Sequence, residues 1–190
     1  MEADWEVEIG GSAPVIEAHW VGFIDLCLEP ERAVQLPEVI HLPFLADMLV
    51  RLNAPASPVW TSKCDVWHPE AFDPDELDAP AGAAQYAIAC YIDLLSRSRR
   101  AWSDPERTVA QCQALCAHLR EIRLRGCRAD LIVRQAAITP GVQSLGITAY
   151  FTACGPAPQQ AGATLALALD AFAASIANIG RPAEDASTLQ

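Results

Sequence analysis

The sequence is poor in positive charge. Only 13 of its 190 residues are lysine or arginine, against 24 aspartates and glutamates, so the formal net charge is −11. Lys63 is the one lysine, and the short group Arg97, Arg99 and Arg100 is too small to form a broad basic face. Affinity for nucleic acid is carried mainly by clustered lysines and arginines. We therefore expect no nucleic-acid partner.

Long apolar runs are also missing. The longest apolar stretches, residues 86–95 and 164–179, are interrupted by Asp93 and Asp170, and both are shorter than the roughly 18–20 residues that span a membrane. The first eleven residues carry three glutamates and an aspartate, where a secretory signal would carry basic residues and an apolar segment. We expect a cytosolic protein with no membrane partner.

Common signatures of metal and cofactor sites are absent. The seven cysteines include no C-x-x-C pair, which is the motif typical of zinc ribbons and of thioredoxin-type redox sites. We expect free thiols. Cys112 and Cys116 belong to an apolar stripe with Val109 and Leu119, which favours core packing over metal binding. G-x-G-x-x-G, Walker A, G-x-S-x-G and H-E-x-x-H do not occur. We predict no metal and no cofactor.

The apolar content is high enough for a buried core. Hydrophobic residues make up 52% of the chain, and the length is typical of one domain. We predict a single α+β domain over residues 1–180, followed by a flexible tail over residues 181–190.

Alternating apolar residues predict six strands in three pairs, each pair followed by a helix. The predicted strands are residues 4–10 and 20–28, 58–68 and 87–95, and 129–138 and 146–154; the predicted helices are residues 37–53, regular only from about Pro43, 105–124 and 158–178. The second strands of the pairs read WVGFIDLCL, AIACYIDLL and GITAYFTAC, which indicates divergent duplication or coincidence. This ββα order predicts a mostly antiparallel six-stranded sheet with three helices on one face. The alternative is a ferredoxin-like βαββαβ core with added elements.

Side-chain alternation places a second set of residues on the face away from the helices. Aromatic and short polar or charged side chains recur there: His19, Phe23, Asp25, Thr61, Lys63, Asp65, Trp67, Tyr91, Asp93, Tyr150 and Thr152, with Glu6, Glu8, Asp130 and Arg134 on the other strands. A merely solvated face would not need these rings. Such a surface indicates a ligand site or an interface, unless loops such as residues 70–84 cover it.

Three groups of residues could carry chemistry. Asp25 and Asp93 occupy equivalent positions in two repeats and could act as paired carboxylates that hold a metal or perform acid/base work; the alternative is that each caps a nearby turn. Lys63 could be a buried nucleophile, or could pair with a surface carboxylate while Cys64 lies in the core. The acidic run from Asp73 to Asp78 lacks the spacing of a calcium loop, so a helix cap is the better interpretation.

We therefore expect a non-catalytic cytosolic binding or assembly protein. Its open sheet face would form a homodimer or bind a small apolar ligand that is not strongly anionic. The alternative is a small, metal-assisted enzyme centred on Asp25, Asp93, His19 and Lys63. A reactive thiol at Cys64 or Cys127 is a third hypothesis.

Overall fold

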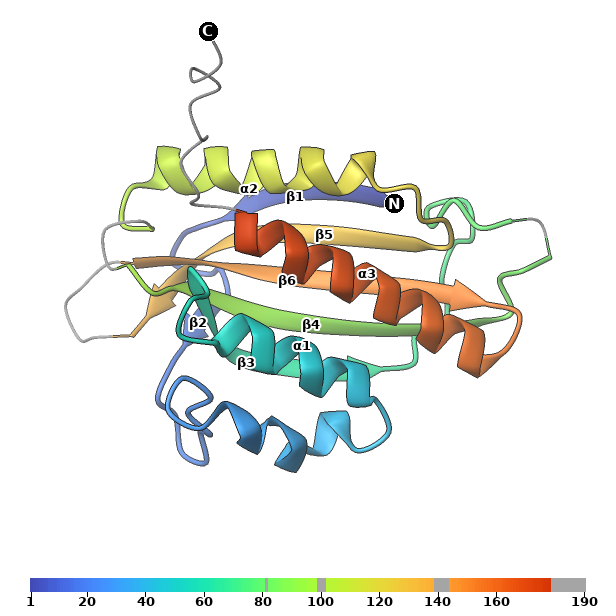
Figure 1. The fold of residues 1–190 in the computed structure, drawn as a ribbon. Helices are drawn as coiled ribbons and strands as arrows, with labels where there is room; N and C mark the ends of the chain where they lie inside the picture. The colour runs from blue at the N-terminus through green and yellow to red at the C-terminus, as the bar shows by residue number, and fades with distance from the viewer. Residues whose placement is uncertain (81, 99–101, 139–143, 179–190) are drawn as a thin grey trace, which may run out of the picture.

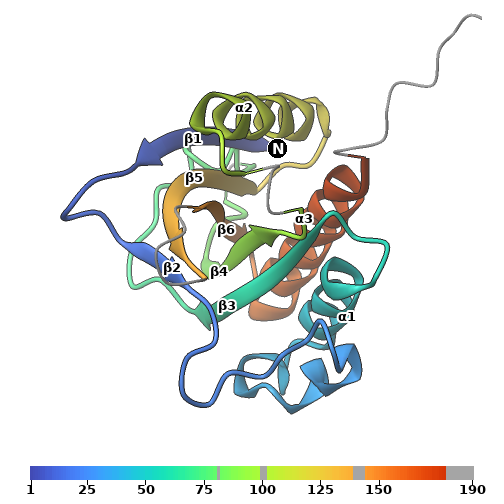
Figure 2. The ribbon, with the colours of Figure 1, turned by 90° about the vertical axis from the view of Figure 1, so that its left-hand side faces the viewer.

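A mixed six-stranded sheet forms the centre of this α+β protein, with three α-helices on one of its faces (Figures 1 and 2). The computed structural model describes residues 1–80, 82–98, 102–138 and 144–178, so the predicted tail lies outside the described residues. The sheet order is β1-β5-β6-β4-β3, and the short β2 also pairs with β5. The strands are β1 (Glu2–Glu8), β2 (Val15–Glu17), β3 (Val59–Trp67), β4 (Tyr86–Ser96), β5 (Cys127–Ala137) and β6 (Ser144–Gly155).

The helices begin at prolines, as expected from the missing N–H of that residue. They are α1 (Pro43–Asn53), α2 (Pro105–Glu121) and α3 (Pro158–Asn178), and two 3-10 turns, η1 (Pro30–Gln35) and η2 (Pro37–Val39), precede α1. Asp104 caps α2, since its carboxylate accepts hydrogen bonds from the backbone N–H groups of Glu106 and Arg107. The predicted irregular start before Pro43 is confirmed.

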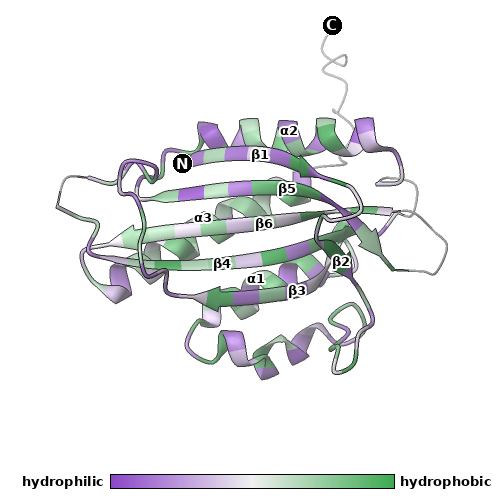
Figure 3. Cartoon of the chain, turned by 180° about the vertical axis from the view of Figure 1, so that it is seen from behind, coloured by the Kyte–Doolittle hydropathy of each residue, from purple (hydrophilic) through white to green (hydrophobic). Residues whose placement is uncertain are grey.

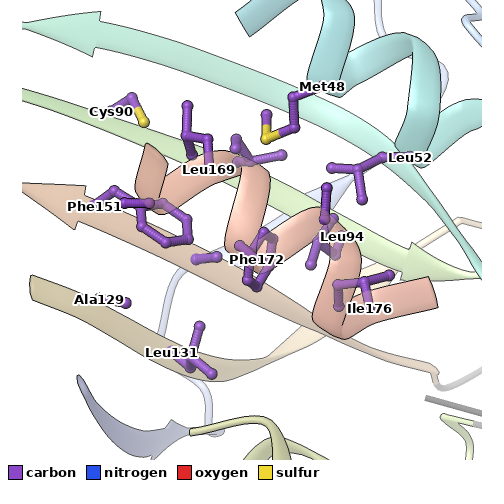
Figure 4. Close-up of a cluster of buried hydrophobic side chains, with 14 of the residues drawn as sticks. Met48, Leu52, Cys90, Leu94, Ala129, Leu131, Phe151, Leu169, Phe172 and Ile176 are labelled. Atoms are coloured by element: carbon purple, nitrogen blue, oxygen red, sulfur yellow. The ribbon is translucent and has the colours of Figure 1, made fainter. Parts of the chain in front are cut away.

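The core lies between the helices and the sheet (Figure 4). Alternate residues of β4, β5 and β6 point toward the helices, and Phe151 meets Phe172 of α3 with ring centroids 5.0 Å apart. In the described part of the chain, α3 is the single helix that is long and apolar enough to cross a membrane by length and composition alone. Its buried side packs on β6 and β4, and core helices of globular proteins pass the same test.

The predicted strand at residues 20–28 is wrong. The backbone turns at His19 (φ 63°) and Gly22 (φ 89°), and the Asp25 carboxylate accepts a hydrogen bond from the Cys27 N–H, which closes a further turn. Leu26 is nevertheless buried in the main core. Trp20, Val21 and Leu28 are exposed, so the apolar pattern of this segment indicates neither a strand nor a continuous buried face. The strand that precedes it, β2, has only three residues.

The predicted sheet order also needs correction. The hairpins β3–β4 and β5–β6 are antiparallel, as expected, but β1 and β2 both run parallel to β5. Because β6 lies between β5 and β4, the order does not confirm a ferredoxin-like core. The ββα repeat is not confirmed either, since the first pair of strands forms no hairpin.

Candidate functional site

The face of the sheet opposite the helices is only partly covered (Figure 3). At one end, Leu77 of the loop between β3 and β4 packs with Ala87 and Cys154; at the other end, Ile16 of β2 packs with Leu95 and Ala136. The predicted loop cover is thus present at the ends. Between these covers lies what we call the central face, which consists of Asp65, Trp67, Tyr91, Asp93, Asp130, Arg134, Thr148, Tyr150 and Thr152.

A row of tyrosines and carboxylates crosses the central face. The register pairs Asp65 with Tyr91, Tyr91 with Tyr150, and Tyr150 with Asp130 on neighbouring strands. The ring centroids of Tyr91 and Tyr150 are 5.7 Å apart, and that of Trp67 is 6.4 Å from each of them. Trp67 remains 38% exposed. The three rings form an aromatic platform with a carboxylate on either side.

Arg134 is held in place by several partners. Its Nε and Nη2 atoms donate to Glu8 Oε2 at 2.9 and 2.7 Å, and its Nη1 donates to the oxygens of Thr148 and Tyr150, each at 3.2 Å. The guanidinium carbon also lies 5.6 Å from the centroid of the Tyr150 ring. A planar, always charged group with these contacts is fixed in orientation and is already neutralised by Glu8.

Asp93 is the buried carboxylate of the central face. Only 7% of the residue is exposed, and its Oδ1 accepts a 2.6 Å hydrogen bond from Thr148 Oγ1. Burial raises the pKa of Asp93, although the Thr148 hydrogen bond and the charges of Arg134 and Lys63 oppose that change. Burial, followed by the charges of Asp93 and Asp65, raises the pKa of Tyr91 to about 12. Tyr91 therefore keeps its proton at neutral pH.

Three predicted site residues lie outside the strands, although the rings of His19 and Phe23 pack near Trp60 of β3. His19, Phe23 and Asp25 belong to the turns after β2, where the His19 and Phe23 rings meet with centroids 5.1 Å apart. The prediction that Asp25 and Asp93 occupy equivalent sheet positions is therefore wrong, and Asp25 caps a turn instead. Residues 20–28 resemble residues 87–95 in sequence but form turns, so the similarity does not predict a shared position in the sheet.

A β-bulge changes the orientation of residues in β3. The register shifts between Thr61 and Cys64, so Thr61 faces α1 and bonds with Asn53, contrary to the prediction. The Lys63 ammonium lies 4.0 Å from a carboxylate oxygen of Glu17 and 5.6 Å from the centroid of the Trp20 ring. Lys63 thus pairs with a surface carboxylate.

The thiols pack as small hydrophobic groups. All seven cysteines are free, and Cys112 and Cys116 are buried in the core as expected. Cys64 packs against the core; burial, and then the charge of Glu38, raises its pKa to about 12. Burial likewise raises the pKa of Cys127 to about 11. Both thiols are therefore protonated and weakly nucleophilic at neutral pH.

A cleft of about 300 Å³ adjoins the central face along the edge strand β3. Its lining includes Trp20, Glu38 and Lys63, together with Asp65 and Tyr91 of the central face. The sequence interpretation did not single out Glu38, because this residue lies in η2 and reaches the cleft only through the tertiary fold. Alternation along β6 puts Thr148 on the same face as Tyr150, but its bond to Asp93 depends on the pairing of β4 with β6.

Within residues 1–80, 82–98, 102–138 and 144–178, no group of three or more histidine, cysteine, aspartate or glutamate side chains is arranged to hold a metal ion. The groups that the central face presents include aromatic rings, carboxylates and one guanidinium. Comparison of the chain with models of protein families, with curated proteins and with solved structures found no match.

Proposed function

We propose that this chain is a binding protein that recognises a positively charged partner through its central face. The observation that carries the proposal is the aromatic platform of Trp67, Tyr91 and Tyr150, which the covering loops leave accessible between Asp65 and Asp130. Aromatic rings attract cations through the negative charge of their faces, and neighbouring carboxylates strengthen that attraction.

The charges of this face favour the same partner. Its cations already have carboxylate partners: Arg134 pairs with Glu8, Arg128 with Asp130 at 2.7 Å, and Lys63 with Glu17. Asp65 has no ion pair within the described part of the chain, and Asp93 is buried beside it on the next strand. The unpaired negative charge, together with a net charge of −11, steers cationic groups toward this surface.

A titration with a charged peptide tests this proposal. Backbone amide NMR spectra would be recorded with pentalysine and, as the control, with pentaglutamate. We expect pentalysine to shift amide signals of β3, β4 and β6 around the platform, and pentaglutamate to leave them unchanged. Trp67→Ala and Asp65→Asn should each weaken binding about two- to fivefold, the size of an exposed cation–π or ion-pair contact. Glu106→Gln on α2 is the matched control.

Either of two results would overturn the proposal. One is a titration in which pentalysine shifts signals only outside the central face. The other is an affinity that is the same for the wild type, Trp67→Ala and Asp65→Asn, since binding would then reflect only the overall negative charge.

Self-association is a second use of the same face. Exposed rings favour it, but two copies placed face to face would bring the unpaired carboxylates of one against those of the other, which opposes it. Sedimentation velocity distinguishes the two uses. If the wild type is a dimer and Trp67→Glu is a monomer, the face forms a homodimer interface. If the wild type is itself a monomer, the face is available for a different partner.

Acid/base catalysis is a second candidate function, and Asp93 is the observation that favours it. A buried carboxyl with a raised pKa beside a threonine, an arginine and a tyrosine has the features of a catalytic acid or base. Calorimetric titration with Mg²⁺, Mn²⁺ and Zn²⁺ tests the metal-assisted version. Absence of binding heat for all three ions would remove that version.

Two further predictions concern the cellular compartment of the protein and its origin by duplication. Seven free thiols support a reducing compartment such as the cytosol. Descent from a duplicated strand–strand–helix unit stays a prediction that rests on the similar sequences of β4 and β6.

A further inference from the structure

A second cleft, of about 760 Å³, opens on the helical side of the sheet. Its floor is formed by Val66 of β3 and Ile88 of β4, and its walls by the N-terminal parts of α1 and α3 with the preceding turn η2. The two helices are joined farther along, where Arg51 Nη1 contacts Asp170 Oδ1 at 2.6 Å. The central face lies on the other side of the sheet (Figures 1 and 3), but Glu38 lines both this cleft and the one beside β3.

The lining is mostly apolar. Leu42, Phe44, Val66 and Ile88 provide much of it, and Pro158, Gly162 and Ala163 of α3 complete one wall. No lysine, arginine or aspartate is among the residues that line it; the polar ones are Glu38, His41, His68 and Gln159. Concave apolar clefts of about 300–1,000 Å³ with a few polar groups are the usual form of small-molecule sites.

Of these polar groups, His68 has a hydrogen-bond partner and Glu38 has an oxygen without one in the described part of the chain. His68 Nδ1 lies 3.1 Å from the carbonyl oxygen of Ala87, which can only accept, so Nδ1 donates in this contact. Glu38 Oε2 is shielded from solvent and has no hydrogen-bond partner among the described residues. A shielded carboxylate oxygen without a donor is costly, so a donor that reaches Glu38 would be favourable.

We propose that this cleft binds a small apolar amine, with its hydrocarbon body on Val66 and Ile88 and its protonated amino group on Glu38. An ammonium group supplies the missing donors and neutralises the carboxylate. The N-terminal end of α3 also borders the cleft, but its dipole is equivalent to only roughly half a positive charge and is screened by solvent, so the full charge of Glu38 decides the sign of the ligand. A ligand carboxylate would instead be repelled. This inference is independent of the proposed function.

Three probes of equal chain length test the proposal by calorimetry: octylamine, octanol and octanoate. We expect saturable binding of octylamine, weaker binding of octanol and the weakest binding of octanoate. Glu38→Gln should lower the affinity for octylamine about tenfold, as expected for the loss of a charged hydrogen bond, and leave that for octanol unchanged. Glu31→Gln, an exposed glutamate of η1 outside the cleft, is the control.

The location of the site is tested by Ala163→Phe. Ala163 is exposed and lines this cleft but not the one beside β3, so the larger ring should block both octylamine and octanol without disturbing the fold, which circular dichroism would verify. The proposal is overturned if folded wild-type protein binds none of the probes, if octanoate binds as tightly as octylamine, or if either Glu38→Gln or Ala163→Phe leaves octylamine binding unchanged.

Discussion

Asp93 and Thr148 lie directly opposite each other on β4 and β6, and the Thr148 hydroxyl donates a 2.6 Å hydrogen bond to the Asp93 carboxylate. Both residues are buried, although they belong to the face of the sheet that the helices do not cover. The hydrogen bond offsets only part of the free-energy cost of burying the charge, because the pKa of Asp93 remains raised. This pair therefore links the central face to the stability of the whole sheet.

Asp93→Asn should stabilise the protein at neutral pH. Because the pKa of Asp93 is higher in the folded state, the folded state binds its proton more tightly, so wild-type stability falls as the pH rises from about 3.8 through the raised pKa. Asparagine can still accept the Thr148 hydrogen bond but carries no charge. Each tenfold change in proton affinity corresponds to about 1.4 kcal/mol. Urea unfolding of both proteins between acidic and neutral pH measures the difference.

The pH dependence of that difference is the critical result. The advantage of Asp93→Asn should disappear as the pH falls toward the pKa of an unfolded aspartate. A variant that is less stable than the wild type at neutral pH would mean that the ionised carboxylate stabilises the fold, contrary to the raised pKa. Thr148→Val, which removes the donor, should have the opposite effect and destabilise the neutral-pH protein.

Regular strands explain why most of the central face could be predicted from sequence. The strands β4 and β6 are regular, so their side chains alternate between the two faces with a period of two residues. This alternation alone places Tyr91, Asp93, Tyr150 and Thr152 on one face. Thr61 departs from the prediction because a β-bulge adds one residue between it and Cys64, which reverses the alternation. Alternation also fails for residues 20–28, which form turns and from which Leu26 and, in part, Ile24 reach the core.

Long-range pairing explains most of the remaining differences. Whether β1 forms a hairpin or runs parallel to β5 depends on contacts such as Glu8 with Arg134, which are 126 residues apart in sequence. Local patterns carry no information about such pairs. Local patterns could not predict the two clefts either, because each combines residues of η2 with residues of β3 and β4.

Phe172→Ala should destabilise the protein by about 3–5 kcal/mol, the usual cost of removing a fully buried aromatic side chain. The Phe172 ring is inaccessible to solvent and packs edge-on against Phe151. Leu167 on the same helix is 57% exposed, so Leu167→Ala should change stability by less than about 0.5 kcal/mol. Chemical denaturation of both variants measures the contrast. Equal effects would contradict the packing of α3 on the sheet.

Two glycine-to-alanine substitutions should have opposite signs. A Cβ atom at Gly146 would lie 2.8 Å from the Leu94 carbonyl oxygen and 2.6 Å from Ile16 Cδ1, so Gly146→Ala must displace the backbone of β4 or β6 and should cost about 1–3 kcal/mol. At Gly162, within α3, a Cβ would meet no atom within 4 Å. Gly162→Ala should stabilise the protein by about 0.5–1 kcal/mol, because alanine loses less backbone entropy in a helix. Thermal unfolding measures both; a stable Gly146→Ala variant would contradict the close approach of the two strands.

Asn53 joins the end of α1 to β3, and its amide group is fully buried. Its Nδ2 donates to the Leu49 carbonyl and to Thr61 Oγ1, each at 2.8 Å, and its Oδ1 accepts from the Thr61 N–H at 3.0 Å. Asn53→Asp preserves the shape of the side chain but replaces the donor by an oxygen that faces the Leu49 carbonyl. We expect a loss of about 3 kcal/mol or more at neutral pH, since a buried charge is added and two donated bonds disappear.

Asn53→Asp keeps the shape of the side chain, so it separates the contribution of the hydrogen bonds to stability from that of packing. Asn53→Ala also removes these bonds but adds no charge, so acidification should improve the relative stability of Asn53→Asp and leave that of Asn53→Ala nearly unchanged. Urea unfolding at neutral and acidic pH measures both variants. If Asn53→Asp matched the wild type at neutral pH, the donated bonds would contribute nothing, and the shape of the side chain alone would hold α1 against the bulge in β3. If instead it recovers at acidic pH, the protonated carboxyl has restored one donor.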